Sequence, residues 1–314
     1  MIPENPSEAS PKIAVAIPCL NEAVTIKKVV TDFKTVLPDA EIHVFDNNST
    51  DHSSDLAREA GALVHRVLKP GKGFVLQAIF DEIKADAVVL VDGDGTYLAE
   101  DIHRLLPPIL QGEADMVVGN RLPFASDDTM RRHRQLGNTL IVKGINLMFG
   151  TKYRDILSGY RVFSRHFVET VPLLTPGFEI ETEMTLQALE EGMFILEIPI
   201  SYRSRPANSH SKLNAFRDGY RIMMTAAMLL RDHNPLRVFG LVALISLMVA
   251  FILTPFLLNQ WGNGNISGVV LLAGILIFVL FSVLAFGIGL LLNAINTRFR
   301  QLKQIMQRNQ QNYE

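Results

Sequence analysis

The chain has 314 residues, of which 48% are hydrophobic and 20% charged, with a formal net charge of -2. This length allows a full catalytic domain plus a membrane-associated part. The near-neutral charge argues against nucleic acid as a partner, and the single cysteine, Cys19, excludes an intramolecular disulfide framework and fits a reducing compartment.

Short β-rich runs alternate with helical stretches between Lys12 and about Pro199. Strands are predicted at residues 13–17, 42–45, 87–91 and 116–118. Helices are predicted between them, at about 24–36, 53–60 and 73–83. This alternation indicates an α/β fold with a mainly parallel sheet. Such sheets bind ligands beyond the carboxyl ends of their strands, so the residues that follow each strand are the first candidates for a site.

Polar residues follow the first two predicted strands, at 18–22 and 46–51. The carboxylate of Asp46 is well placed to accept hydrogen bonds from a base or a ribose. For Ser49 to Asp51 the alternative role is a helix N-cap, because Ser, Thr and Asp all cap well.

The third strand runs into Asp92-Gly93-Asp94-Gly95-Thr96. Alternate side chains of a strand point to opposite sides, so the two glycines are expected to let both carboxylates converge on one cation. Carboxylate oxygens select Mg²⁺ or Mn²⁺, with phosphate oxygens and waters completing the shell. Taken alone, such a pair could equally be a solvated turn.

Together with Gly71-Lys72-Gly73, these motifs resemble the family 2 glycosyltransferases. More narrowly they resemble the polyprenyl-phosphate glycosyltransferases, the group of dolichol-phosphate mannose synthase and the bactoprenol glucosyltransferases. The resemblance implies a GT-A, Rossmann-like nucleotide-sugar domain with a metal at Asp92 and Asp94. It implies that the nucleotide sugar is bound by Pro18, Leu20, Asn21, Glu22, Asp46, Asn48, Lys72, Asp92 and Gly93.

A basic cluster at 131–134 precedes an apolar stretch at 136–149. This pattern is typical of an interfacial amphipathic helix with a basic entrance, and arginine clusters recognise phosphate well. The alternative is a solvated turn leading into a core helix. The residues expected to hold the acceptor phosphate are Arg131, Arg132, Arg134, Arg161 and Ser211.

The segment 155–165 resembles an acceptor-side signature of the same group, and Asp155 is its candidate catalytic or acceptor-orienting carboxylate. A lipid phosphate is already largely ionised at pH 7, so a strong general base is less necessary. Pairing of Asp155 with Arg161 or with an arginine of the basic cluster is an equal alternative.

Acidic residues at 179, 181 and 183 are expected to open a helix, where negative charge suits the dipole. The family resemblance instead places one of them near the sugar or the acceptor. The basic loop 202–212 resembles the mobile loop that closes over the pyrophosphate, although the family commonly has Gly at 208 or 209. The expected catalytic set is Asp94, Asp155, Arg205 and Lys212.

Two uncharged apolar runs, 238–258 and 269–292, are each long enough to cross about 30 Å of hydrocarbon. Basic residues flank both ends of the pair, which places the catalytic domain and both termini in the cytoplasm, with the chain in the cytoplasmic (inner) membrane. The alternative is two buried core helices. The expected parts are a flexible N-terminus (1–11), a catalytic domain (12–212), a juxtamembrane amphipathic helix (213–235), a transmembrane hairpin (236–293, with spans at about 237–258 and 268–292) and a basic tail (294–314).

These expectations combine into one function. It is an inverting, metal-dependent transfer of a hexose from a nucleoside-diphosphate sugar to undecaprenyl or dolichyl phosphate, with a UDP-sugar favoured and GDP-mannose possible. Alternatives are a processive polysaccharide synthase, which usually has more spans and a tryptophan motif, or a non-catalytic membrane partner with the same fold. Two spans per chain would also suit a homo-oligomer.

Overall fold

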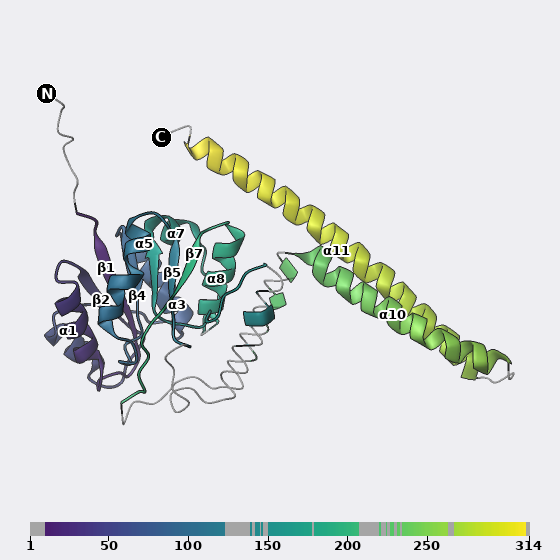
Figure 1. Ribbon diagram of the computed structural model, residues 1–314, viewed down its shortest axis with the longest axis horizontal. Coiled ribbons are helices and arrows are strands. Elements are labelled where there is room, and N and C mark those ends of the chain that lie inside the picture. Colours follow the sequence, from purple (N-terminus) through teal and green to yellow (C-terminus); the bar gives the residue numbers. More distant parts are fainter. Residues whose placement is uncertain are drawn as a thin grey trace. The chain divides into compact units, whose positions relative to one another are not determined.

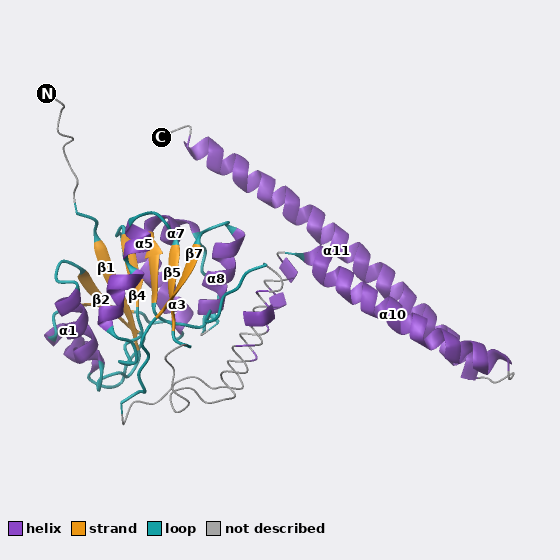
Figure 2. Cartoon of the chain, viewed as in Figure 1, coloured by secondary structure: helices purple, strands orange, loops and turns teal. Residues whose placement is uncertain are grey.

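The computed structural model describes residues 10–122, 139, 142–144, 146, 150–177, 179–206, 220, 224, 227–228, 231–232, 234–262 and 267–311. The chain divides into two compact units, Met1–Ala226 and Ala227–Glu314 (Figure 1). The first unit is an α/β domain and the second is a pair of long helices (Figure 2).

The described part of the first unit contains a seven-stranded sheet in the order β3-β2-β1-β4-β6-β5-β7. The strands are β1 (Ile13–Cys19), β2 (Glu41–Asp46), β3 (Leu63–Arg66), β4 (Ala87–Leu90), β5 (Met116–Asn120), β6 (Arg161–Ser164) and β7 (Ile195–Pro199). The helices are α1 (Ile26–Val36), α2 (Ser53–Glu59), α3 (Lys72–Glu82), η1 (Ala99–Asp101), α4 (Ile102–Leu105), α5 (Pro107–Leu110), α7 (Arg165–Thr170) and α8 (Ile180–Glu190).

The strand pairing confirms the expected α/β fold with a mainly parallel sheet. The pairs β1–β2, β1–β4, β2–β3 and β5–β7 are parallel, and only β6 runs antiparallel, between β4 and β5. All four predicted strands and all three predicted helices are present, while β3, β6 and β7 were not predicted. β4 and β5 are buried along their whole length, as expected for strands covered on both faces.

Each face of the sheet carries its own apolar core. One core includes Phe33 of α1 and Tyr160, whose rings meet edge to face. The other includes Phe163 of β6 and Phe167 of α7, whose rings stack 4.8 Å apart. Burying one such side chain contributes roughly 1.5–3 kcal/mol. The two cores fix the sheet, so the carboxyl ends of β1, β2 and β4 emerge at one edge.

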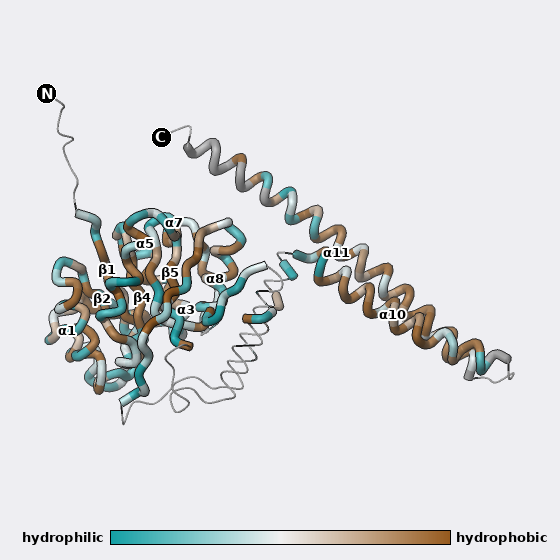
Figure 3. The backbone as a smooth tube through the Cα atoms, viewed as in Figure 1, coloured by the Kyte–Doolittle hydropathy of each residue, from teal (hydrophilic) through white to brown (hydrophobic). Residues whose placement is uncertain are grey.

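The second unit consists of α10 (Pro235–Gly262) and α11 (Ser267–Gln311), which pack against each other. Two serine hydroxyls cross the contact: Ser246 donates to the carbonyl of Phe278, and Ser282 donates to that of Ala243. The stretches Pro235–Gln260 and Gly268–Phe299 are long and apolar enough to cross a membrane. Most of the side chains in these two stretches are not buried within the hairpin, which is unlike the core helices of a water-soluble domain. Figure 3 shows that hydrophobic residues make up most of α10 and of the part of α11 beside it.

Candidate active site

Hydrogen bonds join the loops that follow β1 and β2 into one wall. Asn21, at φ 51°, accepts the backbone N–H of Thr50 at 2.7 Å and donates its own N–H to Ser49 Oγ at 2.9 Å. Ser53 Oγ accepts the N–H of Glu22 at 2.8 Å. Asn tolerates the left-handed conformation better than most residues, which explains its use at this turn. The expected donor-binding residues on these two loops therefore lie together.

Two acidic residues, one at the end of β2 and one in the loop that follows, have local roles that the sequence left open. Asp46 is 6% exposed and accepts the N–H of Ser49 at 3.1 Å, which shapes the turn. Asp51 accepts the N–H of Ser53 at 3.0 Å and that of Ala23 at 3.1 Å, while His52, at the N-cap of α2, forms no capping hydrogen bond through its side chain. Asp51 therefore ties the start of α2 to the loop after β1, and Asp46 lies at the end of β2.

Asn47, which the sequence analysis did not single out, links this wall to the segment before α3. Its side-chain N–H groups donate to the carbonyls of Val67 and Lys69 at 2.9 and 2.7 Å, and its Oδ1 accepts the N–H of Gly71 at 2.8 Å. Gly71 has φ 138°, a conformation that favours glycine. Asn47 therefore sets the start of α3, where Lys72 is the first residue.

Lys72 forms ion pairs with carboxylates from two other elements. Its Nζ lies 2.6 Å from Asp92 Oδ1, after β4, and 2.6 Å from Glu181 Oε1, in the first turn of α8. Burial alone would lower the pKa of Lys72, but the two carboxylates outweigh burial and raise this pKa above its usual value. Burial would raise the pKa of Asp92, yet Lys72 lowers it. Both groups are therefore charged at neutral pH.

Asp94 is held by its own loop and by a distant arginine. It is 4% exposed, and its Oδ1 accepts the N–H of Thr96 at 3.0 Å and the Thr96 hydroxyl at 2.6 Å. Its Oδ2 pairs with Arg205, which also lies 3.9 Å from Glu22. Gly95, at φ 73°, makes the turn between these groups. The loop after β7 thus reaches Asp94 through Arg205, and the expected role of this loop over a pyrophosphate stays a prediction.

The two carboxylates suit an open divalent-cation site. Asp92 and Asp94 offer hard oxygen ligands, and each is balanced here by one cationic side chain, Lys72 or Arg205. Among the described residues no group of three His, Cys, Asp or Glu side chains is arranged to enclose a metal. Mg²⁺ is usually held by one or two carboxylates with substrate phosphates and waters, so this donor set fits such an ion.

Gly159 packs directly against Asp92. A Cβ at position 159 would lie 2.3 Å from Asp92 Oδ2, and the Gly159 N–H donates to Tyr97 Oη at 3.0 Å. We expect Gly159→Ala to push the Asp92 carboxylate aside and to reduce activity at least about tenfold. Because the displaced group is one side chain, the midpoint of thermal unfolding should change by only a few degrees. Initial rates and thermal unfolding on the same preparation check this, and a wild-type rate would contradict it.

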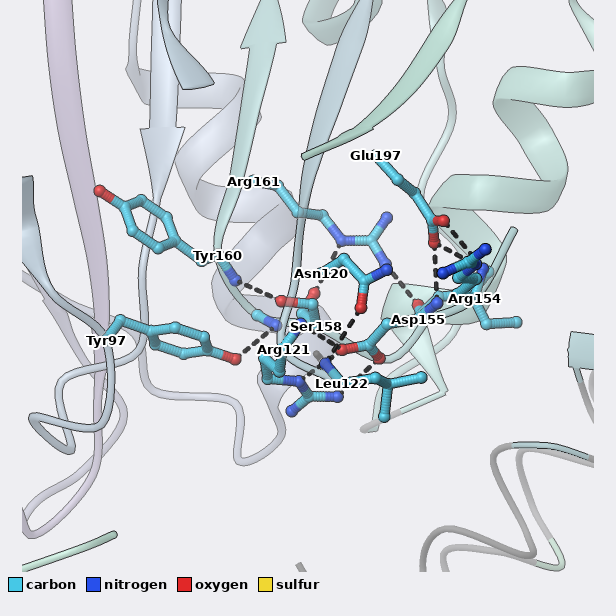
Figure 4. A network of polar contacts seen from close by, with 12 residues as sticks. Tyr97, Asn120, Arg121, Leu122, Arg154, Asp155, Ser158, Tyr160, Arg161 and Glu197 are labelled. Atoms are coloured by element: carbon cyan, nitrogen blue, oxygen red, sulfur yellow. Dashed lines mark hydrogen bonds and ion pairs between the residues drawn. The ribbon is translucent and has the colours of Figure 1, made fainter. Parts of the chain in front are cut away.

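Asp155 pairs with Arg121, an arginine that the sequence analysis did not consider (Figure 4). Two guanidinium nitrogens of Arg121 donate to the two oxygens of Asp155 at 2.7 and 2.8 Å, and Asp155 is fully buried. Glu197 accepts the N–H groups of Arg154 and Asp155 and fixes this turn. Burial would raise the pKa of Asp155, but Arg121 holds it below its usual value. This carboxylate is therefore committed to an ion pair.

The structure does not support the expected phosphate contact of Arg161. Its side chain is fully buried, and its guanidinium donates to the carbonyls of Ser158 and Ile156 and to Thr185 Oγ1 (Figure 4). Burial lowers the pKa of Arg161 to about 10. Backbone carbonyls and one hydroxyl satisfy this cation inside the domain, so it braces the 156–161 turn and does not meet a ligand.

Two buried oxygens in the first turns of α8, Glu181 Oε2 and Thr182 Oγ1, have no hydrogen-bond partner among the described residues. An unpaired buried hydroxyl costs about 1–3 kcal/mol. Thr182→Val replaces this hydroxyl with a methyl group of similar shape, so we expect it to raise stability by about 1 kcal/mol. Thermal unfolding checks this. A lower midpoint would show that the hydroxyl has a partner.

Several expected residues lie outside the described part of the chain. These are Arg131, Arg132 and Arg134 of the basic cluster, most of the 136–149 and 213–235 stretches, and Ser211 and Lys212 of the basic loop. Among the described residues, Lys72 pairs with Asp92, and Arg205 pairs with Asp94 and lies 3.9 Å from Glu22. Asp46 lies at the end of β2, where it accepts the N–H of Ser49. Pro18 pairs with Phe45 in the β1–β2 register, and Leu20 and Gly93 lie next to these strand ends.

Comparison with known proteins gives a consistent assignment. Residues 14–171 match the model of glycosyl transferase family 2. Glycosyltransferase AglJ of Haloferax volcanii is 35% identical over 283 residues, which cover 88% of this chain and 91% of that protein. Polyprenol monophosphomannose synthase of Mycolicibacterium smegmatis is 28% identical over 64% of this chain and 82% of that protein. Undecaprenyl-phosphate mannosyltransferase of Micrococcus luteus is 26% identical over 62% and 84%.

A solved structure supports the fold independently. Glucosyl-3-phosphoglycerate synthase from Mycobacterium tuberculosis, in complex with Mn²⁺, UDP-glucose and phosphoglyceric acid, superposes with a TM-score of 0.60 at 22% identity, over 71% of this chain and 80% of that one. The expected GT-A domain is thereby confirmed. With the family model spanning half of the chain and AglJ matching nearly all of it, this protein belongs to the family 2 glycosyltransferases.

Proposed function

We propose that this glycosyltransferase moves a hexose from a nucleoside-diphosphate sugar to a polyprenyl phosphate at the cytoplasmic membrane face, with inversion at the anomeric carbon. The observation that carries the proposal is the pairing of Asp92 with Lys72 and of Asp94 with Arg205 in the loop that follows β4. A UDP-sugar is the favoured donor, and GDP-mannose is the second candidate.

The charged residues at the strand ends suit a diphosphate. Asp92 and Asp94 would hold Mg²⁺ or Mn²⁺, which neutralises charge on the departing nucleoside diphosphate. Lys72, at the start of α3, and Arg205, in the loop after β7, add positive charge, and Lys212 is proposed to join them. The complex of the synthase from M. tuberculosis with Mn²⁺ and UDP-glucose supports this reading of the donor side.

The second unit and the names of the relatives support the acceptor side of this proposal. Two helices long and apolar enough to span a membrane would keep the domain beside a lipid substrate. The relatives from Mycolicibacterium smegmatis and Micrococcus luteus are named for polyprenol and undecaprenyl-phosphate substrates. Arg131, Arg132 and Arg134 remain our candidates for the lipid phosphate, and the basic residues that flank both helices favour a cytoplasmic domain.

In the proposed reaction a lipid phosphate oxygen forms a bond to the anomeric carbon while the bond from that carbon to the diphosphate breaks. The nucleophile is already ionised, so no side chain has to remove a proton from it. The binding of Asp155 by Arg121 agrees with a mechanism that needs no general base at this position. The chain's contribution is in-line positioning together with charge stabilisation of the leaving group.

A radiolabel transfer assay with the full chain in detergent tests this function. The assay contains undecaprenyl phosphate, either Mg²⁺ or Mn²⁺, and one member of a panel of labelled UDP- and GDP-hexoses. We expect one donor to deliver label to the lipid phase, with one sugar per lipid and with loss of activity in EDTA. Label in a polymer would favour a processive synthase. Nucleotide binding without any transfer to lipid would show that the acceptor is wrong.

A further inference from the structure

Three elements meet at the ammonium group of Lys72. Lys72 begins α3, Asp92 follows β4, and Glu181 lies in the first turn of α8, with Nζ 2.6 Å from an oxygen of each acid. The backbone of the α3 start is fixed, because the Gly73 N–H donates to the carbonyl of Pro176 at 3.0 Å and a Cβ at Gly73 would meet Thr175 O at 1.8 Å. Only the side chain of Lys72 can move without rebuilding this contact.

The two carboxylates around Lys72 differ in their surroundings. The Asp92 side chain is 27% exposed, whereas that of Glu181 is 6% exposed. Glu181 Oε2 is buried and has no hydrogen-bond partner among the described residues. An ammonium carries three donors, and a buried carboxylate oxygen is costly until it receives one. Glu181 therefore offers the same lysine a second acceptor beside the one already used.

Asp92 cannot serve Lys72 and a divalent cation equally well. When a second positive charge approaches the carboxylate, the ammonium 2.6 Å away is repelled. We propose that Glu181 is a positioning residue, which takes over the Lys72 ammonium through both of its oxygens when Asp92 turns to the metal. This inference rests on the proposed function, in particular on a metal at Asp92 and Asp94.

The arrangement has two consequences for the site. Glu181 lowers the competition between Lys72 and the metal for Asp92, because it offers the ammonium a second carboxylate with the same charge as Asp92. It also keeps Lys72 charged and close to the diphosphate, rather than letting the side chain leave. Removing the Glu181 carboxylate should therefore weaken metal binding, and should do so only while Lys72 is present.

The test measures Mn²⁺ binding from the electron paramagnetic resonance signal of the free ion, with UDP at saturating concentration. The four full-length chains are the wild type, Glu181→Gln, Lys72→Met and the double variant. We expect Glu181→Gln to weaken Mn²⁺ binding about tenfold in the presence of Lys72 and by less than about twofold when position 72 is Met. The readout requires neither the sugar nor the lipid acceptor.

Thr182→Val is the matched control, because position 182 carries the neighbouring buried oxygen without a described partner. It should leave Mn²⁺ affinity unchanged. Glu181→Ala replaces Glu181→Gln if the amide variant does not fold, as judged by thermal unfolding. If the change at position 181 weakens Mn²⁺ binding equally with Lys72 and with Met at position 72, or does not weaken it when Lys72 is present, the role of Glu181 is refuted. The proposed function is not affected by either result. A wild-type chain that binds UDP but no Mn²⁺ removes the metal from the proposed function, and this inference with it.

Discussion

Asp94→Asn is expected to lower the rate of sugar transfer by about a thousandfold while the protein remains folded. The amide keeps an oxygen that can accept the N–H and hydroxyl of Thr96, so the loop should persist. It replaces the charged oxygen that faces Arg205 by an N–H donor, which can hold neither the arginine nor a divalent cation. Initial rates of label transfer and thermal unfolding, measured together, separate these effects.

Asp115→Asn is the matched control for this prediction. Asp115 also accepts a backbone N–H, that of Phe194 at 3.0 Å, but it precedes β5 and so lies at the amino ends of the parallel strands. We expect this variant to transfer sugar within about twofold of the wild-type rate, because surface substitutions away from a site usually have small effects. A normal rate in Asp94→Asn would refute the metal-site assignment.

The strands that the sequence predicted are those with uninterrupted apolar runs. β1 and β4 are buried between two layers, so their composition alone identified them. β3 has only four residues and exposed ends, and the pattern of β7 is mostly half-buried. β6 begins with Arg161, and this charged residue kept its short run from being recognised as an apolar strand. Burial of that charge depends on carbonyls that only the folded chain brings close.

The strand pattern predicted only the part of the candidate site at the strand ends, and Lys72 and Arg205 were expected from the family resemblance alone. The edge of a parallel sheet gathers the ends of neighbouring strands, which is why Asp46, Asp92 and Asp94 could be expected together. The partners of these acids come from elsewhere: Lys72 lies 20 residues from Asp92, and Arg205 lies 111 residues from Asp94. No periodicity relates such positions. The pairing of Arg121 with Asp155, 34 residues away, and the contacts of Asn47 could not be predicted from the sequence pattern for the same reason.

Asp155→Ala is expected to destabilise the protein by about 3–5 kcal/mol, because it leaves the Arg121 guanidinium without its carboxylate in a mostly buried position. Replacing both residues, as in Arg121→Met with Asp155→Leu, removes the charge as well and should recover part of this loss. Thermal unfolding of the three chains in the same detergent measures the difference. A double variant no more stable than Asp155→Ala would show that the two residues act separately.

The pH dependence of the same ion pair has a definite sign. The pKa of Asp155 is lower in the folded protein than in the unfolded chain, where it is about 3.9. The stability that the ionised carboxylate contributes is therefore fully present above about pH 3.9 and is lost as the pH falls through the lower pKa of the folded protein. The stability gap between wild type and Asp155→Asn should therefore be full at neutral pH and should narrow below about pH 4. This separates the two roles that the sequence left open for Asp155. A catalytic base would lose turnover on substitution without losing stability, whereas the partner of Arg121 loses stability first.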